Sequence, residues 1–272
     1  MTEPTPVLRL EGIVKTFPGV RALDGVSFTV LPGEVHALMG ENGAGKSTLM
    51  KVLGGIYQPD EGQIIVGEAP AVMNTPLEAK AKGIIFIHQE LSLATELSVA
   101  ENIWLGELPR KSWGRVDWKT LYDSTDAILK KLRVGFNAKT RVGDLSIANQ
   151  QMVEIARALT HQARAVIFDE PTASLTDAEK VVLFDVIADL QRDGVGIIYI
   201  SHRMEEIFRI TDRISVLRDG QYRGTLNTRE TNEDEVTQLM IGRSLDLSRN
   251  VSHHALGDVA LEVRGLSCGK LY

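Results

Sequence analysis

A stretch in the first fifth of the chain runs Gly40-Glu41-Asn42-Gly43-Ala44-Gly45-Lys46-Ser47-Thr48, and its first eight residues match the pattern G-x-x-x-x-G-K-[ST]. An apolar, strand-like run precedes them at 34–39, and a helix-like segment follows at 47–53. A glycine-rich turn in this place can wrap tightly enough to point several backbone N–H groups inward. The N-terminus of the following helix adds partial positive charge at the same point. The pattern therefore predicts a loop that binds phosphate groups, rather than a plain turn between a strand and a helix.

The side chains of this loop predict a nucleotide and a metal ion. Lys46 is expected to place a full positive charge on the β- and γ-phosphates, and the Ser47 hydroxyl is expected to hold Mg²⁺. The residues expected to contact the nucleotide here are Gly40, Asn42, Gly43, Ala44, Gly45, Lys46, Ser47 and Thr48.

Composition excludes several other classes of protein. The chain has 272 residues, 43% hydrophobic and 24% charged, which suits one large or two small globular domains. Its formal net charge is −6 and no basic block stands out, which argues against a nucleic-acid partner. No apolar run approaches the roughly 18–20 residues that cross a bilayer, and no secretory signal pattern opens the sequence. Cys268 is the only cysteine, which fits a reducing cytoplasm.

Apolar runs of strand length alternate with helical patterns, which predicts an α/β domain with a mostly parallel sheet and a small antiparallel sheet. Asp219-Gly220 is expected to form a hairpin turn. The clearest helix is expected over 177–193, where Thr176 and Glu179 form a capping box. Strands are expected at 7–13, 27–31, 35–39, 63–66, 84–87, 165–168, 196–200 and 213–217.

Two further segments bear on the organisation of the chain. The pattern turns helical over about 90–160, which predicts a helical insertion that holds the three tryptophans, as local packing or as a partner surface. The segment 260–266 resembles 7–13, since both alternate like a strand and end in glycine plus an aliphatic residue. A chain that restarts its first strand is expected to be the front half of a tandem repeat, with chance similarity as the alternative.

Four features beyond the loop carry chemistry. The apolar run 165–168 leads into Asp169, which is positioned to hold Mg²⁺, and Glu170, which can orient and deprotonate an attacking water. Gln89 follows another strand and could reach Mg²⁺ or that water. His202 follows a third strand and could contact a γ-phosphate. Ser146 precedes a helix, either as a simple N-cap or as a hydroxyl offered to a phosphate.

Taken in this order, these residues resemble the ATP-binding cassette family. The loop at 40–48 is similar to its Walker A motif, Gln89 to its Q-loop, and 145–151 to its signature motif. The stretch 165–170 is similar to Walker B, 173–177 to the D-loop, and His202 to the switch histidine. The resemblance covers 8–242 and implies a P-loop NTPase core. Phe17 stands where the family places an aromatic that stacks on adenine.

Three stretches, at 14–24, 96–103 and 170–176, are similar to the tandem ATPase subunits of bacterial monosaccharide importers. The resemblance implies a cassette at 1–244, a linker at 245–259, and the opening strand of a truncated second cassette at 260–272. It departs from the family where Ile147, Ala148 and Asn149 replace Gly-Gly-Gln in the signature, and where Thr176 replaces the usual D-loop Asp. Ser146 is kept, so a phosphate contact in trans remains possible.

The function implied is ATP hydrolysis with Mg²⁺ that energises import of a monosaccharide or nucleoside-like solute. Two cassettes would pack head to tail, with the partner being the missing second half or another copy. The segment after Gln89 and the Trp104 region would contact transmembrane permease subunits. The chain would then lie at the cytoplasmic face of the inner membrane, and a periplasmic solute-binding protein would act on it indirectly. Two alternatives stay open, a soluble cassette ATPase outside transport and a nucleotide-responsive module with little turnover. A GTPase is disfavoured because no Asn-Lys-x-Asp guanine motif is present.

Overall fold

A computed structural model gives the fold, and it describes residues 5–88, 91–160, 163–242, 262 and 264. Two units divide the chain, at 1–242 and 243–272. In the second unit only Glu262 and Arg264 are described; they form an ion pair and lie in no helix or strand. The predicted linker and most of the predicted second opening strand therefore lie outside the described residues.

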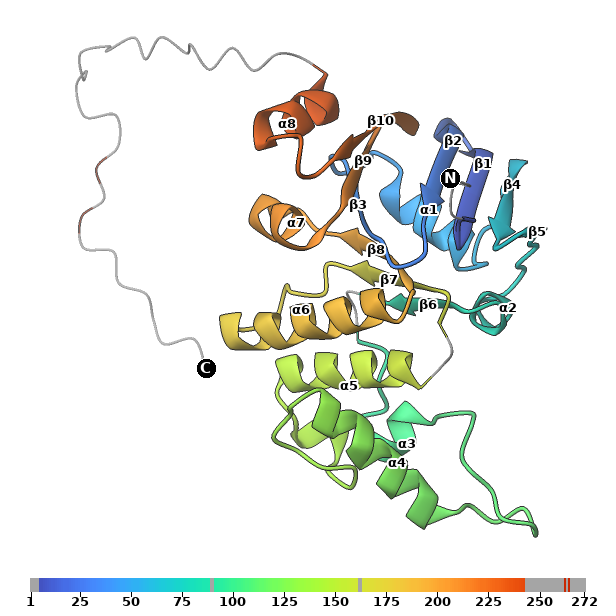
Figure 1. Cartoon of the computed structure of the whole chain (residues 1–272), viewed down its shortest axis with the longest axis vertical. Coiled ribbons are helices and arrows are strands. Elements are labelled where there is room, and N and C mark those ends of the chain that lie inside the picture. The colour runs from blue at the N-terminus through green and yellow to red at the C-terminus, as the bar shows by residue number, and fades with distance from the viewer. Residues whose placement is uncertain (1–4, 89–90, 161–162, 243–261, 263, 265–272) are drawn as a thin grey trace. The chain divides into compact units, whose positions relative to one another are not determined.

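The first unit contains two sheets (Figure 1). One is antiparallel with the strand order β2-β1-β4-β5, and the other has the order β10-β9-β3-β8-β7-β6 and is parallel except for β10. This confirms the predicted α/β architecture. The strands are β1 (Leu8–Phe17), β2 (Val20–Val30), β3 (Val35–Met39), β4 (Glu61–Val66), β5 (Ala69–Pro70), β6 (Ile84–Ile87), β7 (Ala165–Asp169), β8 (Gly196–Ile200), β9 (Arg213–Arg218) and β10 (Gln221–Asn227).

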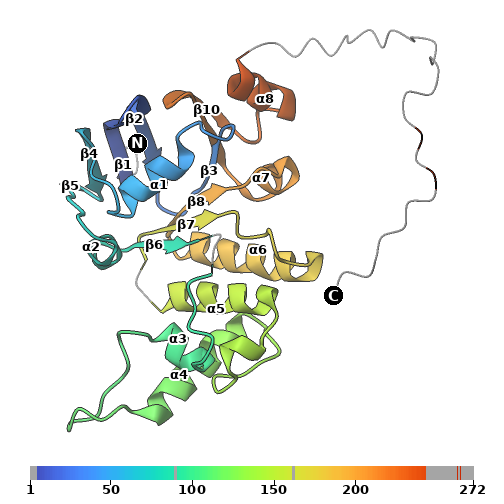
Figure 2. The ribbon, with the colours of Figure 1, turned by 180° about the vertical axis from the view of Figure 1, so that it is seen from behind.

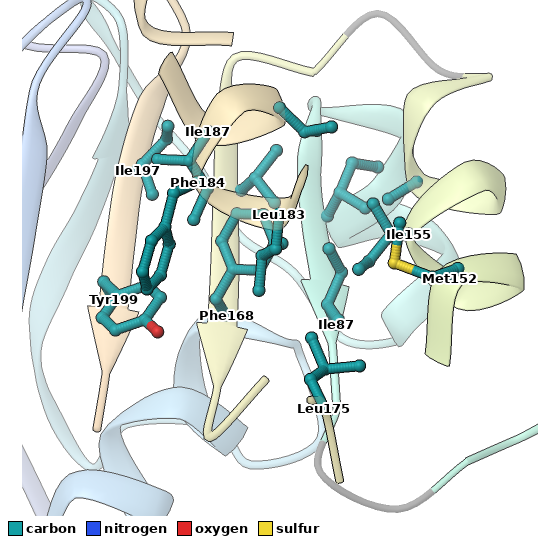
Figure 3. Close-up of a cluster of buried hydrophobic side chains, with 14 of the residues drawn as sticks. Ile87, Met152, Ile155, Phe168, Leu175, Leu183, Phe184, Ile187, Ile197 and Tyr199 are labelled. Carbon is teal, nitrogen blue, oxygen red and sulfur yellow. The ribbon is translucent and has the colours of Figure 1, made fainter. Parts of the chain in front are cut away.

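Successive side chains of a strand point to opposite sides of the sheet. In the central strands both of these sides are buried. In β7, Phe168 belongs to one apolar cluster and Ile167 to another. In β8, Tyr199 and Ile198 divide in the same way. Figure 3 shows the first cluster, where Phe168 and Tyr199 lie beside residues of α5 and α6. The parallel sheet is thus held between two apolar layers.

Helices cover both faces of this sheet (Figures 1 and 2). The second cluster joins α1 to the antiparallel sheet, and the first cluster packs against α5 to α8. The expected capping box of Thr176 and Glu179 begins α6, which confirms that prediction. The helices are α1 (Lys46–Leu53), α2 (Pro76–Ala81), α3 (Val99–Ile103), α4 (Trp118–Lys131), α5 (Ile147–Leu159), α6 (Asp177–Arg192), α7 (Met204–Ile210) and α8 (Glu233–Ile241), with a 3₁₀ turn at Val142–Asp144.

The segment predicted to be a helical insertion contains α3, α4 and α5, which pack on one another. Trp104 is half-buried and its indole N–H donates to Oγ1 of Thr125 at 3.0 Å. Trp118 stacks on Tyr122, with ring centroids 5.8 Å apart. Trp113, by contrast, is 90% exposed. Trp104 therefore serves packing, Trp118 packs on Tyr122 while staying 45% exposed, and Trp113 offers the most exposed ring of the three.

Strand bounds differ from the prediction mainly in the antiparallel sheet. The expected strand at 27–31 is the end of β2, which begins at Val20. Register shifts interrupt the pairing of β1 with β2, and Gly12 and Gly25 have φ of 60° and 69°. These bulges break the period-2 alternation that a sequence pattern needs, so the first half of β2 could not be seen. The hairpin turn at Asp219-Gly220 is confirmed, with φ of 52° and 73°.

No helix in the described ranges is long and apolar enough to span a lipid bilayer.

Candidate functional site

The glycine-rich loop joins the end of β3 to the start of α1, as the sequence predicts. Gly45 is the N-cap of α1 in the left-handed region, with φ of 105° and no side-chain cap. Every other described helix of eight or more residues has a side-chain cap, from Asp117, Ser146, Thr176 or Asn232. The first N–H groups of α1 are therefore left for an outside anion.

Two glycines of the loop are required by close backbone approach. A Cβ on Gly40 would lie 2.4 Å from the carbonyl oxygen of Leu217, and a Cβ on Gly45 would lie 2.8 Å from that of Ala22. Gly43 has φ of 85°, but a Cβ there would meet nothing within 4 Å. The loop is thus pressed against the protein at both ends and open in its middle, which is the shape of a cradle.

Lys46, the first residue of α1, reaches back along this loop. Its Nζ donates to the carbonyl oxygen of Gly40 at 2.5 Å and to that of Glu41 at 3.0 Å. Burial lowers the pKa of Lys46, against the opposing charges of Glu170 and Asp169. The ammonium group is therefore placed over the loop opposite two carboxylates.

Those carboxylates come from the end of β7. Burial raises the pKa of Asp169, and the charge of Glu170 adds to the rise, while His88 and Lys46 oppose it. Glu170 follows the strand with φ of 50°, a conformation that is costly for a residue with a side chain. Its N–H donates to the carbonyl oxygen of Ile200 on β8 at 2.9 Å, which helps to hold that conformation.

His202 lies directly against Glu170. Its Nδ1 is 2.8 Å from Oε2 of Glu170, and the side chains are 74% and 18% exposed respectively. Because β7 and β8 are neighbouring parallel strands, their carboxyl ends bring these two residues to the same edge of the sheet. The arrangement pairs a carboxylate with an imidazole whose ring faces solvent.

One pocket of about 920 Å³ gathers the predicted site. It is lined by Lys46, Ser47, Asp169, Glu170 and His202, together with Gly40, Asn42, Gly43, Gly45 and Thr48 of the loop. Ten further lining residues were not predicted from the sequence, namely Val20, Arg21, Ala22, Met39, Ile200, Ser201, Met204, Asp219, Gly220 and Met240. Val20 and Arg21 lie at the β1–β2 turn and Asp219 and Gly220 at the β9–β10 turn, and these two hairpin tips reach the loop.

The residues present fit a magnesium nucleotide. Ser47 and Asp169 offer hard oxygen ligands in the same pocket, which suits Mg²⁺. The described residues contain no group of three His, Cys, Asp or Glu side chains arranged to hold a metal ion. Mg²⁺ is usually held by one or two carboxylates plus phosphate oxygens, so a protein cage is not needed here.

Four predicted site residues lie apart from this pocket or beyond description. Ala44 of the loop is 4% exposed and does not line the pocket. Gln89 is outside the described residues. Ser146 is the N-cap of α5, and its hydroxyl accepts from the Asn149 N–H at 3.3 Å. Phe17 packs edge-on against Tyr57, with ring centroids 5.2 Å apart, and pairs across the β1–β2 hairpin with Val20, which lines the pocket. The roles of all four stay predictions.

Ser47 and Asp169 also face a second cavity of about 320 Å³, lined further by His88, Glu154 and Arg157. His88 precedes Gln89 and stacks on Phe86, with ring centroids 5.6 Å apart. Its charge opposes the rise in the pKa of Asp169. His88 was not predicted as a site residue, because its nearness to Asp169 arises only from the fold.

The fold and the pocket define a class of protein, and comparison with known proteins identifies it. A family model described as ABC transporter matches residues 23–173, which is more than half of the chain. The chain belongs to the ABC transporter family.

Among its relatives, the ribose import ATP-binding protein RbsA 2 of Rubrobacter xylanophilus is 55% identical over 262 residues. That match covers 96% of this chain and 50% of the relative. A putative ribose/galactose/methyl galactoside import ATP-binding protein of Burkholderia cenocepacia is 50% identical over 267 residues, covering 97% and 52% respectively. The chain thus spans about half the length of the curated relatives it matches.

Solved structures agree with the fold. A crystal structure of the ATP-binding cassette of an ABC transporter, in its ADP conformation, matches with a TM-score of 0.75 and 28% identity. The match covers 88% of this chain and 99% of that one. A nucleotide-free cassette matches with a TM-score of 0.74 and 27% identity, covering 88% and 96%.

Proposed function

We propose that this chain binds and hydrolyses ATP with Mg²⁺ and so energises import of a monosaccharide or nucleoside-like solute. The observation that carries the proposal is the contact of Glu170 with His202 in the pocket that also holds Lys46. A phosphate loop alone could serve many reactions, but a carboxylate and an imidazole facing it are suited to activating water beside a terminal phosphate.

Phosphate binding is assigned to the loop and α1. In the structure the Lys46 ammonium donates to two carbonyl oxygens of the loop. Phosphate oxygens bound in the loop would accept the same hydrogen bonds more strongly, because they carry negative charge. The uncapped N–H groups of α1 add donors at the same place. Ser47 and Asp169, with Gln89, would hold Mg²⁺, which neutralises charge on the phosphate oxygens when bound.

Water activation is assigned to Glu170. Its carboxylate lies beside the pocket and would accept a proton from a water held in line with the γ-phosphate. His202 contacts Oε2 of Glu170 and stays mostly exposed, so its ring would both orient the carboxylate and reach the γ-phosphate. The two residues act together in this proposal.

A second cassette would complete the site. Ser146 lies at an exposed helix N-terminus rather than in this pocket, which fits a hydroxyl that serves a nucleotide held by another cassette. That other cassette would be a second half of the protein or a second copy of this chain. ATP bound between the two would favour the closed pair, and hydrolysis would release it.

Import is supported by the names of the relatives, which are ribose or galactose import ATP-binding proteins. We propose that this chain lies at the cytoplasmic face of the inner membrane and contacts permease subunits there. A periplasmic solute-binding protein would act on it through those subunits. Stimulation of ATP hydrolysis by reconstituted permease subunits and the loaded binding protein tests this part. A rate unaffected by them would favour a cassette ATPase outside transport.

Calorimetric titration with MgATP tests the nucleotide site. Lys46→Ala should weaken ATP binding by about 10-fold or more, because it removes a charge-assisted contact worth roughly 1.5–3 kcal/mol. Lys130→Ala, an exposed lysine at the end of α4, is the matched control and should bind ATP like the wild type. Equal affinity of the Lys46→Ala chain and the wild type would contradict the assignment of the loop.

A further inference from the structure

Glu206, in the first turn of α7, is a buried carboxylate that joins three hydroxyl groups. Its side chain is 8% exposed. Oε2 accepts from Oγ1 of Thr172 at 2.8 Å, from the Tyr199 hydroxyl at 2.9 Å and from Oγ of Ser201 at 3.2 Å. A carboxylate only accepts hydrogen bonds and bears a full negative charge, so it holds hydroxyl donors more strongly than an amide or a hydroxyl would.

Two of these hydroxyls belong to segments of the proposed reaction site. Thr172 is 1% exposed and follows Glu170 by two residues, with Pro171 between them. Ser201 is 4% exposed and directly precedes His202. Glu206 therefore links the segment that follows β7 to the segment that follows β8. Both linked residues lie within two positions of the Glu170–His202 contact.

The third hydroxyl anchors the carboxylate to the sheet. Tyr199 is fully buried, and its ring belongs to the apolar cluster of Figure 3. Oε1 of Glu206 has no hydrogen-bond partner within the described part of the chain, and its nearest cation is Nη1 of Arg203 at 3.8 Å. The carboxylate is thus fixed almost wholly through one oxygen, whose three partners come from β8 and from the segments that follow β7 and β8.

The backbone near Glu206 needs such support. Glu170 holds φ of 50°, a conformation that persists only where its surroundings determine it. The Arg203 N–H donates to Oγ of Ser201 at 3.1 Å, so the same hydroxyl that reaches Glu206 also fixes the turn containing His202. Loss of the carboxylate would free both turns together.

We propose that Glu206 is a positioning residue, which holds Glu170 and His202 at contact distance by tying Thr172 to Ser201. The proposal rests on the proposed function insofar as this contact serves ATP hydrolysis. Glu206 does not line the nucleotide pocket, so it acts through the two turns. Its removal should therefore lower turnover and leave ATP affinity unchanged.

The experiment compares Glu206→Leu, Glu206→Gln and Thr172→Val with the wild type. Leu removes the acceptor, Gln keeps one acceptor oxygen, and Thr172→Val cuts only the link toward Glu170. Glu205→Gln is the matched control, since Glu205 neighbours Glu206 on α7 but is exposed. ATP affinity, kcat and the melting temperature are measured for each chain, together with amide hydrogen exchange without nucleotide.

We expect Glu206→Leu and Thr172→Val to lower kcat by about 10- to 100-fold, as displacement of a catalytic group does. Their ATP Kd should stay within about twofold of the wild type. Glu206→Gln should retain more activity than Glu206→Leu, and Glu205→Gln should match the wild type. Exchange should accelerate at the amides of Glu170 and Arg203, and not within the paired parts of β7 and β8.

Hydrogen exchange keeps the two proposals separable. A wild-type chain that binds ATP without hydrolysing it would overturn the proposed turnover, while exchange at Glu170 and Arg203 would still test Glu206. Should Glu206→Leu fail to fold, Thr172→Val removes a single hydroxyl and carries the test. A folded Thr172→Val chain with wild-type kcat and wild-type exchange at Glu170 would overturn the positioning role.

Discussion

Nδ1 of His202 lies 2.8 Å from Oε2 of Glu170, although the two residues come from different strands. Strand β7 ends at Asp169 and strand β8 at Ile200, and these two residues are direct partners in the parallel sheet. Glu170 follows the one, and His202 follows the other after Ser201. The contact is therefore a product of sheet register, and a shift of β7 against β8 would break it.

The loop glycines give a paired test of the cradle. Gly40→Ala should lower the free energy of unfolding by several kcal/mol, because its Cβ would overlap the carbonyl oxygen of Leu217 at 2.4 Å. Gly43→Ala should cost only about 1–2 kcal/mol, because its new Cβ would contact nothing and the only cost is that of a positive φ for alanine. Chemical denaturation of the two variants measures the difference. Equal losses would show that the loop is not pressed against β9.

Glu34 directly precedes β3 and contacts His36 of β3 and Arg213 of β9, and this cluster predicts loss of stability in acid. Burial alone would raise the pKa of Glu34, but hydrogen bonds with His36 and Arg213 outweigh it and lower the pKa from 4.5 to about 2. Arg213 meets the carboxylate with two nitrogens, at 2.6 and 2.9 Å. Since the folded pKa is lowered, this stabilisation is complete above about pH 4.5 and is lost as the pH falls toward 2.

The shift corresponds to roughly 3 kcal/mol of stability at neutral pH. Glu34→Gln should lose about that amount at pH 7 and should approach the wild type near pH 2. Unfolding by urea at a series of pH values from 7 to 2 measures both curves. A constant gap between them across that range would remove Glu34 as the source of the acid dependence.

The tryptophans of the helical segment predict opposite outcomes. Trp104→Ala should cost about 3–5 kcal/mol of stability, because it empties a packed site and leaves Thr125 without the indole N–H. Trp113→Ala should change stability by less than about 0.5 kcal/mol, since that ring is 90% exposed. Thermal unfolding compares the two variants. A large loss from Trp113→Ala would show that its ring packs on the protein.

Much of the parallel sheet could be predicted because its strands are apolar runs that lead into glycine-rich or charged segments. The strands at 35–39 and 196–200 are apolar apart from His36, as buried parallel strands mostly are, and the structure gives them the predicted bounds. The loop at 40–48 follows from its glycines and Lys46. Their meeting with Asp169 and Glu170 follows from the rule that parallel strands carry their sites at their carboxyl ends.

Other features depend on contacts that no local pattern carries. The sequence has no signal for Glu206, because its three hydroxyl partners lie on two other segments and a glutamate in the first turn of a helix is ordinary. The pocket residues at 219–220 arrive through the fold of the β9–β10 hairpin. Phe17 occupies an expected position, but its ring packs on Tyr57, which sequence spacing could not foresee.

Hydrolysis of ATP by the wild-type chain and by Glu170→Gln, measured at saturating MgATP together with binding affinity, tests the central claim most directly. Glutamine keeps the size of the side chain and removes its ability to accept a proton. We expect ATP affinity to be retained and kcat to fall by about 10²- to 10⁴-fold. Hydrolysis by Glu170→Gln near the wild-type rate, with ATP bound, would contradict the assignment of Glu170 as the base.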